Sequence, residues 1–158
     1  MPDSPTSPSL SGFVDELDLL IRARYPLIYL VTWEEQRVDA LLATLAESHG
    51  KALYTWSATQ GLYRLDNGRT ASKAAGPTDP GAALAAVEKL AEPALVVFKD
   101  FHPFLNDAVV IRRLRELAHT LKTTFTTMML VSPVLAIPPE LEKEISVLDV
   151  PLPAIEDL

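Results

Sequence analysis

The sequence predicts a single α/β domain in which a mainly parallel, five-stranded sheet lies between two layers of helices. Residues 27–31, 94–98 and 128–131 are uninterrupted apolar runs, which are typical of strands buried on both faces of a parallel sheet. Segments with helical spacing of apolar residues separate these runs, and such alternation requires crossover connections. The chain has 158 residues, of which 48% are hydrophobic, and this is enough for one core of that kind.

Composition and charge argue against several classes of protein. The net charge of −7 disfavours binding to a phosphate backbone, so we expect no nucleic-acid partner. Cysteine is absent from the sequence, which leaves neither a disulfide framework nor a thiolate metal site. No secretory signal pattern is visible, and no apolar run has the length of a membrane span. We therefore expect a soluble, cytoplasmic protein.

The two ends of the chain are predicted to lie outside the folded domain. Three prolines and three serines fall within the first ten residues, so residues 1–11 are predicted to be a disordered tail. The domain is expected over residues 12–153, beginning with a helix that Ser11 caps and that ends before Pro26. Residues 154–158 are interpreted as the start of a linker to a following module.

The turn after the first strand decides whether the sheet carries a nucleotide site. A threonine followed three residues later by glutamate predicts a capping box, with Thr32 as the cap and Glu35 as its partner. A phosphate-binding loop, G-x-x-x-x-G-K-[ST], requires glycines and a lysine at this point. The turn 32–35 contains neither, and Glu34 and Glu35 place negative charge where phosphate charge would lie. The sequence therefore predicts a sheet that lacks the P-loop.

The remaining elements are less regular. Residues 51–56 and 147–150 are mixed in polarity, so we expect them at the two edges of the sheet. Residues 61–65 with the Asn67–Gly68 pair predict a small hairpin, and residues 66–81 predict a surface loop. Further helices are predicted over residues 82–90 and 138–141. Another helix is predicted after a cap at Asn106, and its apolar face consists of Val110, Leu114, Leu117 and Leu121.

Asp100 and His102 follow the central apolar strand and are the weak candidates for catalysis. In P-loop NTPases an acid at this position holds Mg²⁺, but Phe101 replaces the glutamate that would polarise water. The pair is either an acid–base or metal pair, or Asp100 caps the next turn while His102 makes a structural hydrogen bond. We favour the second interpretation, because the sequence places no third ligand or nucleophile beside them.

Two groups of residues are candidates for interactions. Arg112, Arg113 and Arg115 either act on the phosphates of a neighbouring molecule or form a solvated helix face that meets an acidic partner, and we favour the latter. Four aromatic residues are predicted to anchor the core or an interface rather than to stack on bases: Trp33, Trp56, Phe101 and Phe104.

Three stretches resemble one group of AAA-family ATPases, which is known from cyanobacteria, algal plastids and other bacteria as a hypothetical chloroplast open reading frame protein. They are residues 20–35 (LIRARYPLIYLVTWEE), 97–105 (VFKDFHPFL) and 137–141 (IPPEL). The resemblance extends over residues 13–153 and implies a degenerate ATPase-like domain that precedes an intact AAA module. It also implies a RecA-like three-layer sandwich with the strand order 147–150, 27–31, 128–131, 94–98, 51–56.

The resemblance and the residues together predict a non-catalytic regulatory or scaffolding domain that recruits a partner or contributes to assembly. ATP and Mg²⁺ are expected only in the C-terminal module, which is itself an expected partner together with other proteins. An oligomer of the full-length protein is compatible with this prediction. The alternative is a weakly active nucleotide-binding ATPase domain, or a hydrolase that uses Asp100 and His102.

Overall fold

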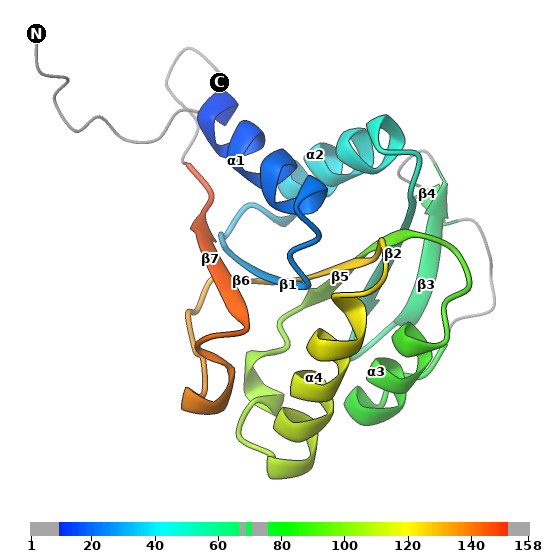
Figure 1. Cartoon of the computed structure of the whole chain (residues 1–158), viewed down its shortest axis with the longest axis vertical. Coiled ribbons are helices and arrows are strands. Elements are labelled where there is room, and N and C mark those ends of the chain that lie inside the picture. Colours follow the sequence, from blue (N-terminus) through cyan, green and yellow to red (C-terminus); the bar gives the residue numbers. More distant parts are fainter. Residues whose placement is uncertain (1–9, 67–68, 71–75, 152–158) are drawn as a thin grey trace, which may run out of the picture.

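The structure is a computed structural model that describes residues 10–66, 69–70 and 76–151. Seven strands form one sheet, and helices cover both of its faces (Figure 1). The strands are β1 Leu27–Val31, β2 Ala52–Ser57, β3 Gly61–Asp66, β4 Arg69–Thr70, β5 Ala94–Lys99, β6 Thr127–Ser132 and β7 Ile145–Asp149. The helices are α1 Leu10–Arg22, α2 Glu35–Ser48, α3 Pro80–Glu88 and α4 Ala108–Leu121, with 3₁₀ turns η1 His102–Phe104 and η2 Pro139–Leu141.

The parallel part of the sheet has the predicted order. The strands run β4-β3-β2-β5-β6-β1-β7, and β7, β1, β6, β5 and β2 are mutually parallel neighbours. The three wholly apolar strands are therefore interior, with Met129 of β6 paired to Ile28 on one side and to Val97 on the other. The predicted three-layer α/β sandwich is confirmed.

The prediction of five strands with residues 51–56 at an edge is wrong. A short turn follows β2, and β3 returns antiparallel along the side that β5 does not occupy. β4 then pairs antiparallel with β3, which extends the sheet to seven strands. The predicted loop over residues 66–81 is wrong in part, because β4 lies within it and α3 already begins at Pro80. The predicted Asn67–Gly68 turn lies outside the described residues. β7 does end the described sheet, as predicted.

Helices α1 and α2 cover one face of the sheet. Their core is formed by residues such as Leu17 and Leu42, which pack against the alternate strand residues Ile28 and Met129. In Figure 1 both helices lie above the sheet, with α3 and α4 below it. None of the helices in the described part of the chain has the length and hydropathy of a membrane span.

Helices α3 and α4 cover the other face, over a core built on aromatic rings. Trp56 is fully buried, and its ring lies 5.0 Å from Phe98 and 5.5 Å from Phe101, centroid to centroid. Its indole N–H donates a hydrogen bond to the Pro77 carbonyl at 3.0 Å, which satisfies the one polar atom of the side chain. The predicted apolar face of α4 is buried here as well. Trp56 and Phe101 are thus core anchors, as predicted.

Two of the predicted helix caps are wrong. Ser11 lies within α1, because the helix already begins at Leu10. Asp107 rather than Asn106 caps α4, and its carboxylate accepts hydrogen bonds from two backbone N–H groups, at 2.8 and 3.3 Å. Aspartate is at least as good a cap as asparagine, so local propensity does not distinguish the two positions. Of the tail predicted for residues 1–11, residues 1–9 lie outside the described residues, as do residues 154–158 at the other end.

Candidate functional site

A cleft opens at the carboxyl ends of β1, β5 and β6, where an open α/β sheet usually binds its ligand. Its volume is about 530 Å³. Three of its lining residues carry carboxylates and one is a tryptophan. We call this the carboxyl-end cleft, and its lining residues are Thr32, Trp33, Glu34, Glu35, Gln36, Asp100 and Pro133.

The turn between β1 and α2 forms one wall of the carboxyl-end cleft. The buried Thr32 donates its backbone N–H to the Ser132 carbonyl at 3.0 Å, and its hydroxyl accepts from the Glu34 N–H at 2.9 Å. The N-cap of α2 is Glu34, which makes no side-chain cap bond. The predicted capping box is therefore wrong, because Thr32 is used to tighten the turn two residues before the helix.

This tight turn leaves Trp33 outside the core. Its side chain is 81% exposed, whereas the side chain of Trp56 is completely buried. Sequence reasoning treated both tryptophans as anchors of the core or of an interface. The structure assigns only Trp56 to the core.

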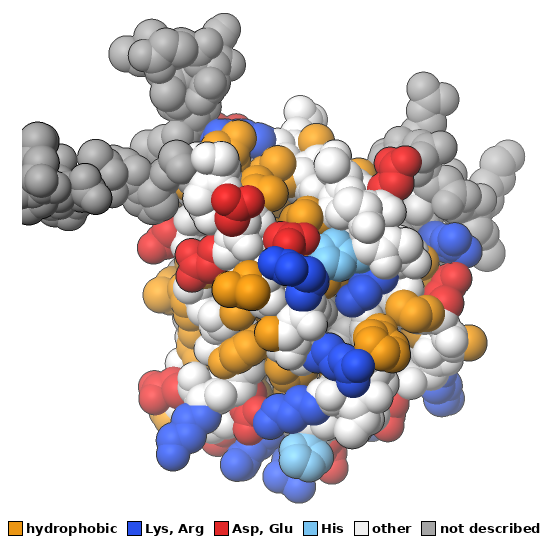
Figure 2. Space-filling model, turned by 45° about the horizontal axis from the view of Figure 1, so that its top comes forward, with side chains coloured by type: hydrophobic (Ala, Val, Ile, Leu, Met, Phe, Trp, Pro, Cys, Tyr) orange, Lys and Arg blue, Asp and Glu red, His pale blue; other side chains and the backbone are white. Residues whose placement is uncertain are grey.

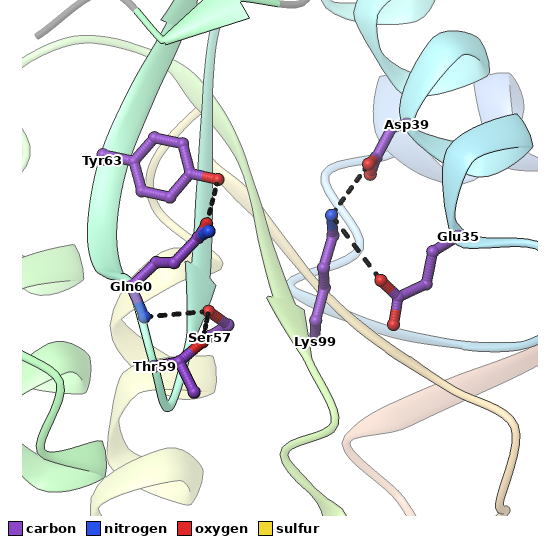
Figure 3. A network of polar contacts seen from close by, with 7 residues as sticks. All are labelled: Glu35, Asp39, Ser57, Thr59, Gln60, Tyr63 and Lys99. Atoms are coloured by element: carbon purple, nitrogen blue, oxygen red, sulfur yellow. Dashed lines mark hydrogen bonds and ion pairs between the residues drawn. The ribbon is translucent and has the colours of Figure 1, made fainter.

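Lys99, the last residue of β5, is a basic side chain close to this wall of the cleft. Carboxylates of α2 already bind its ammonium group. Its ammonium lies 2.8 Å from an oxygen of Asp39 and 3.9 Å from one of Glu35 (Figure 3). Glu35 and Asp39 are one helical turn apart, so both face the end of β5. Sequence reasoning missed this network, although a lone lysine after an apolar strand and two acids at i, i+4 spacing were its visible signal.

Asp100 adds a third carboxylate to the carboxyl-end cleft. Its backbone has φ of 51°, in the left-handed region, and its N–H donates to the Val131 carbonyl at 2.9 Å. The prediction that Asp100 caps the next turn is wrong, because Phe101 is the N-cap residue of η1 and no side-chain cap bond is made there. Within the described residues the exposed Asp100 carboxylate has no hydrogen-bond or ion-pair partner.

His102 does make the expected hydrogen bond, to Ser132. Its Nδ1 lies 2.8 Å from the Ser132 hydroxyl, which also accepts from the Val134 N–H at 3.0 Å. A serine beside a histidine suggests a nucleophile and its base. However, Ser132 is only 2% exposed, so its hydroxyl is not accessible to a substrate carbonyl. Among the described residues no group of three potential metal ligands is found.

The arginines of α4 are not part of this cleft. Arg112, Arg113 and Arg115 are all exposed, and none of them is among its lining residues. Arg112 lies 3.8 Å from Glu116 one turn along the same helix, and Arg113 reaches the carbonyl of Gly81 at 3.5 Å. The structure therefore separates the predicted interaction residues into two sets, with Trp33 in the cleft and the arginines on the helix.

The sequence matches a known family over most of its length. The family described as "SpoVK-like AAA ATPase, N-terminal domain" matches residues 13–150. This chain belongs to that family. The match confirms the resemblance seen in residues 20–35 and 97–105, and it covers the strands and helices from within α1 to the end of β7.

Relatives of this N-terminal domain are longer proteins. The chain is 38% identical over 147 residues to the "Uncharacterized AAA domain-containing protein ycf46" of Guillardia theta, covering 90% of this chain and 28% of that protein. It is 34% identical to the protein of the same name from Trieres chinensis, covering 92% and 29%. The chain thus spans less than a third of the length of these relatives.

Solved structures give weaker likenesses. A chain in the structure of Drosophila ORC bound to AT-rich DNA and Cdc6 is 10% identical, with a TM-score of 0.44, over 89% of this chain and 53% of that one. A chain in the complex with GC-rich DNA has a TM-score of 0.36, with 95% and 62% covered. Scores this low carry no functional argument. The strand order of the sheet therefore establishes the fold here.

Proposed function

We propose that this domain is a non-catalytic regulatory or scaffolding part of a larger AAA-family ATPase, which recruits a partner or contributes to assembly. In this proposal the domain has no working nucleotide site. ATP and Mg²⁺ bind to the AAA module that follows it in the full-length protein. That module and other cytoplasmic proteins are its partners, and neither nucleic acid nor a membrane is among them.

The charge of the carboxyl-end cleft is the observation that carries the proposal. Glu34, Glu35 and Asp100 line the place where an active sheet of this class would hold phosphates, and the lining contains no lysine or arginine. The nearby Lys99 ammonium is bound to Asp39 and does not offset phosphate charge. A nucleotide phosphate would meet like charge at a cost on the order of a few kcal/mol. The cleft thus disfavours the ligand that this position binds in active ATPases.

No observation favours the alternative of a hydrolase. Asp100 and His102 are close in sequence, but His102 is hydrogen bonded to the buried Ser132 and Asp100 contacts neither of them through a hydrogen bond in the described structure. A general base needs an accessible nucleophile or water within hydrogen-bond reach. The exposed Asp100 carboxylate supplies charge to the cleft instead.

Two measurements test the proposal. Calorimetric titration of ATP·Mg²⁺ into the chain is expected to give no binding at micromolar concentrations, and a dissociation constant in that range would contradict the absence of a nucleotide site. ATP turnover and oligomer size of the full-length protein are then compared with and without residues 1–153. We expect at least one of two changes. Either ATP turnover changes by about 5- to 150-fold, the usual range for coupled sites, or the assembly state changes. Unchanged turnover, assembly and partner capture would overturn the regulatory role.

A further inference from the structure

We propose that the carboxyl-end cleft binds an arginine side chain presented by a basic segment of a partner protein. The guanidinium would lie on the Trp33 indole and donate hydrogen bonds to the neighbouring carboxylates. This inference rests on the proposed function, since it names the kind of partner that the domain would recruit. Three features of the cleft carry it: an exposed aromatic ring, unpaired carboxylates, and a backbone, fixed by hydrogen bonds, that carries both.

The first feature is the exposure of Trp33. An indole that is 81% exposed leaves a large apolar face in water, while the other tryptophan of the chain is fully buried. Tryptophan is enriched at the centres of interfaces, because its rigid ring supplies contact area at little entropic cost. A cation above the ring is also attracted by the negative face of the indole. Trp33 is therefore suited to contact with a chemical group that is both flat and positively charged.

The second feature is the charge beside the ring. Glu34 and Asp100 take part in no ion pair within the described residues, and Glu35 has only a long contact of 3.9 Å with Lys99. On the face drawn in Figure 2, acidic and basic side chains are interspersed. The lining of the carboxyl-end cleft differs, because its only charged groups are three carboxylates. A cationic group is thus complementary to it, and an anionic one is not.

The third feature is the rigidity of the two walls. The Thr32 hydrogen bonds tie the turn that carries Trp33 to β6 and to α2. Asp100 is tied to the same strand by its N–H bond to Val131. Since the backbone that carries the ring and the carboxylates is held before a ligand arrives, the conformational entropy lost on binding is mainly that of the side chains.

Arginine fits these features better than lysine or a metal ion. A guanidinium is planar, so it stacks on an aromatic face while its five N–H groups, which lie in its own plane, donate to carboxylates at its edge. An ammonium is a strongly hydrated point charge and makes fewer of these contacts at once. A divalent cation needs a compact set of oxygen ligands. The described residues contain no group of three potential metal ligands.

The test uses the whole chain and three peptides of equal length: acetyl-GRGRG-amide and its lysine and glutamate counterparts. The indole N–H resonances of Trp33 and Trp56 are followed by ¹⁵N–¹H spectroscopy, and affinity is measured by calorimetry at two salt concentrations. We expect the arginine peptide to shift Trp33 but not Trp56, and to bind several-fold more tightly than the lysine peptide. Trp33→Ala is expected to weaken binding by about five-fold or more, and Trp33→Phe by less.

Charge variants separate this site from general attraction to an acidic protein. Asp100→Asn is expected to weaken binding by about three-fold and to reduce its salt dependence. Glu16→Gln, which removes an exposed carboxylate from α1, is expected to leave binding unchanged. Equal losses in both variants would overturn the site, as would equal binding of the three peptides or no binding at all. Circular dichroism confirms that each variant is folded.

Two further outcomes are distinguishable in the same samples. A Trp33 shift that depends on protein concentration without peptide would mean that a second copy of the chain occupies the cleft, which would overturn a basic partner segment. ATP·Mg²⁺ is titrated in parallel. If neither the arginine peptide nor ATP·Mg²⁺ binds, only this inference is contradicted. If the nucleotide binds in the cleft, the proposed function is contradicted.

Discussion

The Lys99 ammonium lies 2.8 Å from a carboxylate oxygen of Asp39, and this contact joins the last residue of β5 to the second turn of α2. The lysine side chain is only 19% exposed, so water screens the pair weakly on that side. Glu35 lies on the same helix, 3.9 Å from the ammonium. One cation therefore lies between two acids that would otherwise repel each other more strongly beside the carboxyl-end cleft (Figure 3).

Replacing this lysine should destabilise the domain without changing its fold. Lys99→Met removes a charge-assisted hydrogen bond and leaves Asp39 and Glu35 without a counter-charge. We expect the free energy of unfolding to fall by about 1–2 kcal/mol, the lower part of the range for such bonds because both acids are partly exposed. Urea unfolding followed by circular dichroism measures it.

A double-mutant cycle isolates the contact itself. Asp39→Asn in the Lys99→Met background should cost less than in the parent, with a coupling of about 1 kcal/mol. The matched control is Lys122→Met, which breaks a longer contact of 3.4 Å between a more exposed lysine and Glu144 and should cost about 0.5 kcal/mol or less. Equal losses of unfolding free energy in the two lysine variants would show that the Lys99 network stabilises the domain no more than the Lys122 contact does.

The two tryptophans should respond differently to truncation. Trp56→Ala empties the centre of the aromatic cluster with Phe98 and Phe101 and leaves the Pro77 carbonyl without its donor. We expect a loss of about 3–5 kcal/mol. Trp33→Ala removes a side chain that contacts mostly water, so its effect should stay within about 0.5 kcal/mol. Thermal and urea unfolding of both variants test this, and a large loss at Trp33 would show that it supports the core.

Gly61 begins β3 in a conformation that other residues rarely adopt. Its φ is +74°, and a Cβ atom there would lie 2.3 Å from the backbone oxygen of Gly76. Gly61→Ala is therefore expected to cost about 2 kcal/mol or more, from the left-handed backbone and the clash together. Gly50 has φ of +65° with open space around it, so Gly50→Ala should cost only about 1 kcal/mol. Similar unfolding midpoints for the two variants would contradict the close approach of the Gly61 and Gly76 backbones.

Stability should decline at alkaline pH through Tyr54. Burial raises the pKa of Tyr54 above its usual value of 10.0, and a 2.7 Å hydrogen bond to Glu92 raises it further. The unfolded chain then releases this proton first, so stability present below pH 10 is lost as the pH rises through the folded pKa. Absorbance at 295 nm should show a tyrosine component that titrates above pH 10, and Tyr54→Phe should remove this component. An unchanged titration in that variant would contradict the assignment.

Local sequence patterns were sufficient for the interior of this fold. Runs such as residues 94–98 have no polar residue, so only a position between two neighbouring strands and two helical layers accommodates them. The strand order followed from the family resemblance, and the structure has that order. The lack of glycine and lysine in residues 32–35 is likewise a property of the sequence alone.

The edge of the sheet and the caps were not determined in this way. β2 is mixed in polarity because several of its side chains are only partly buried, and this periodicity does not report that β3 pairs along its outer edge. Asn106 and Asp107 are both good caps, and the choice between them depends on how η1 leads into α4.

What the sequence determined by itself is the α/β class, the three interior strands and the absence of phosphate-binding residues after the first of them. The tertiary structure alone decided that Trp56 is buried while Trp33 lies in the cleft, and that Lys99 meets Asp39. The physical reason is that burial and ion pairing depend on neighbours that are far apart in the chain. Residues 39 and 99 come within hydrogen-bond distance only after β5 and α2 have packed together.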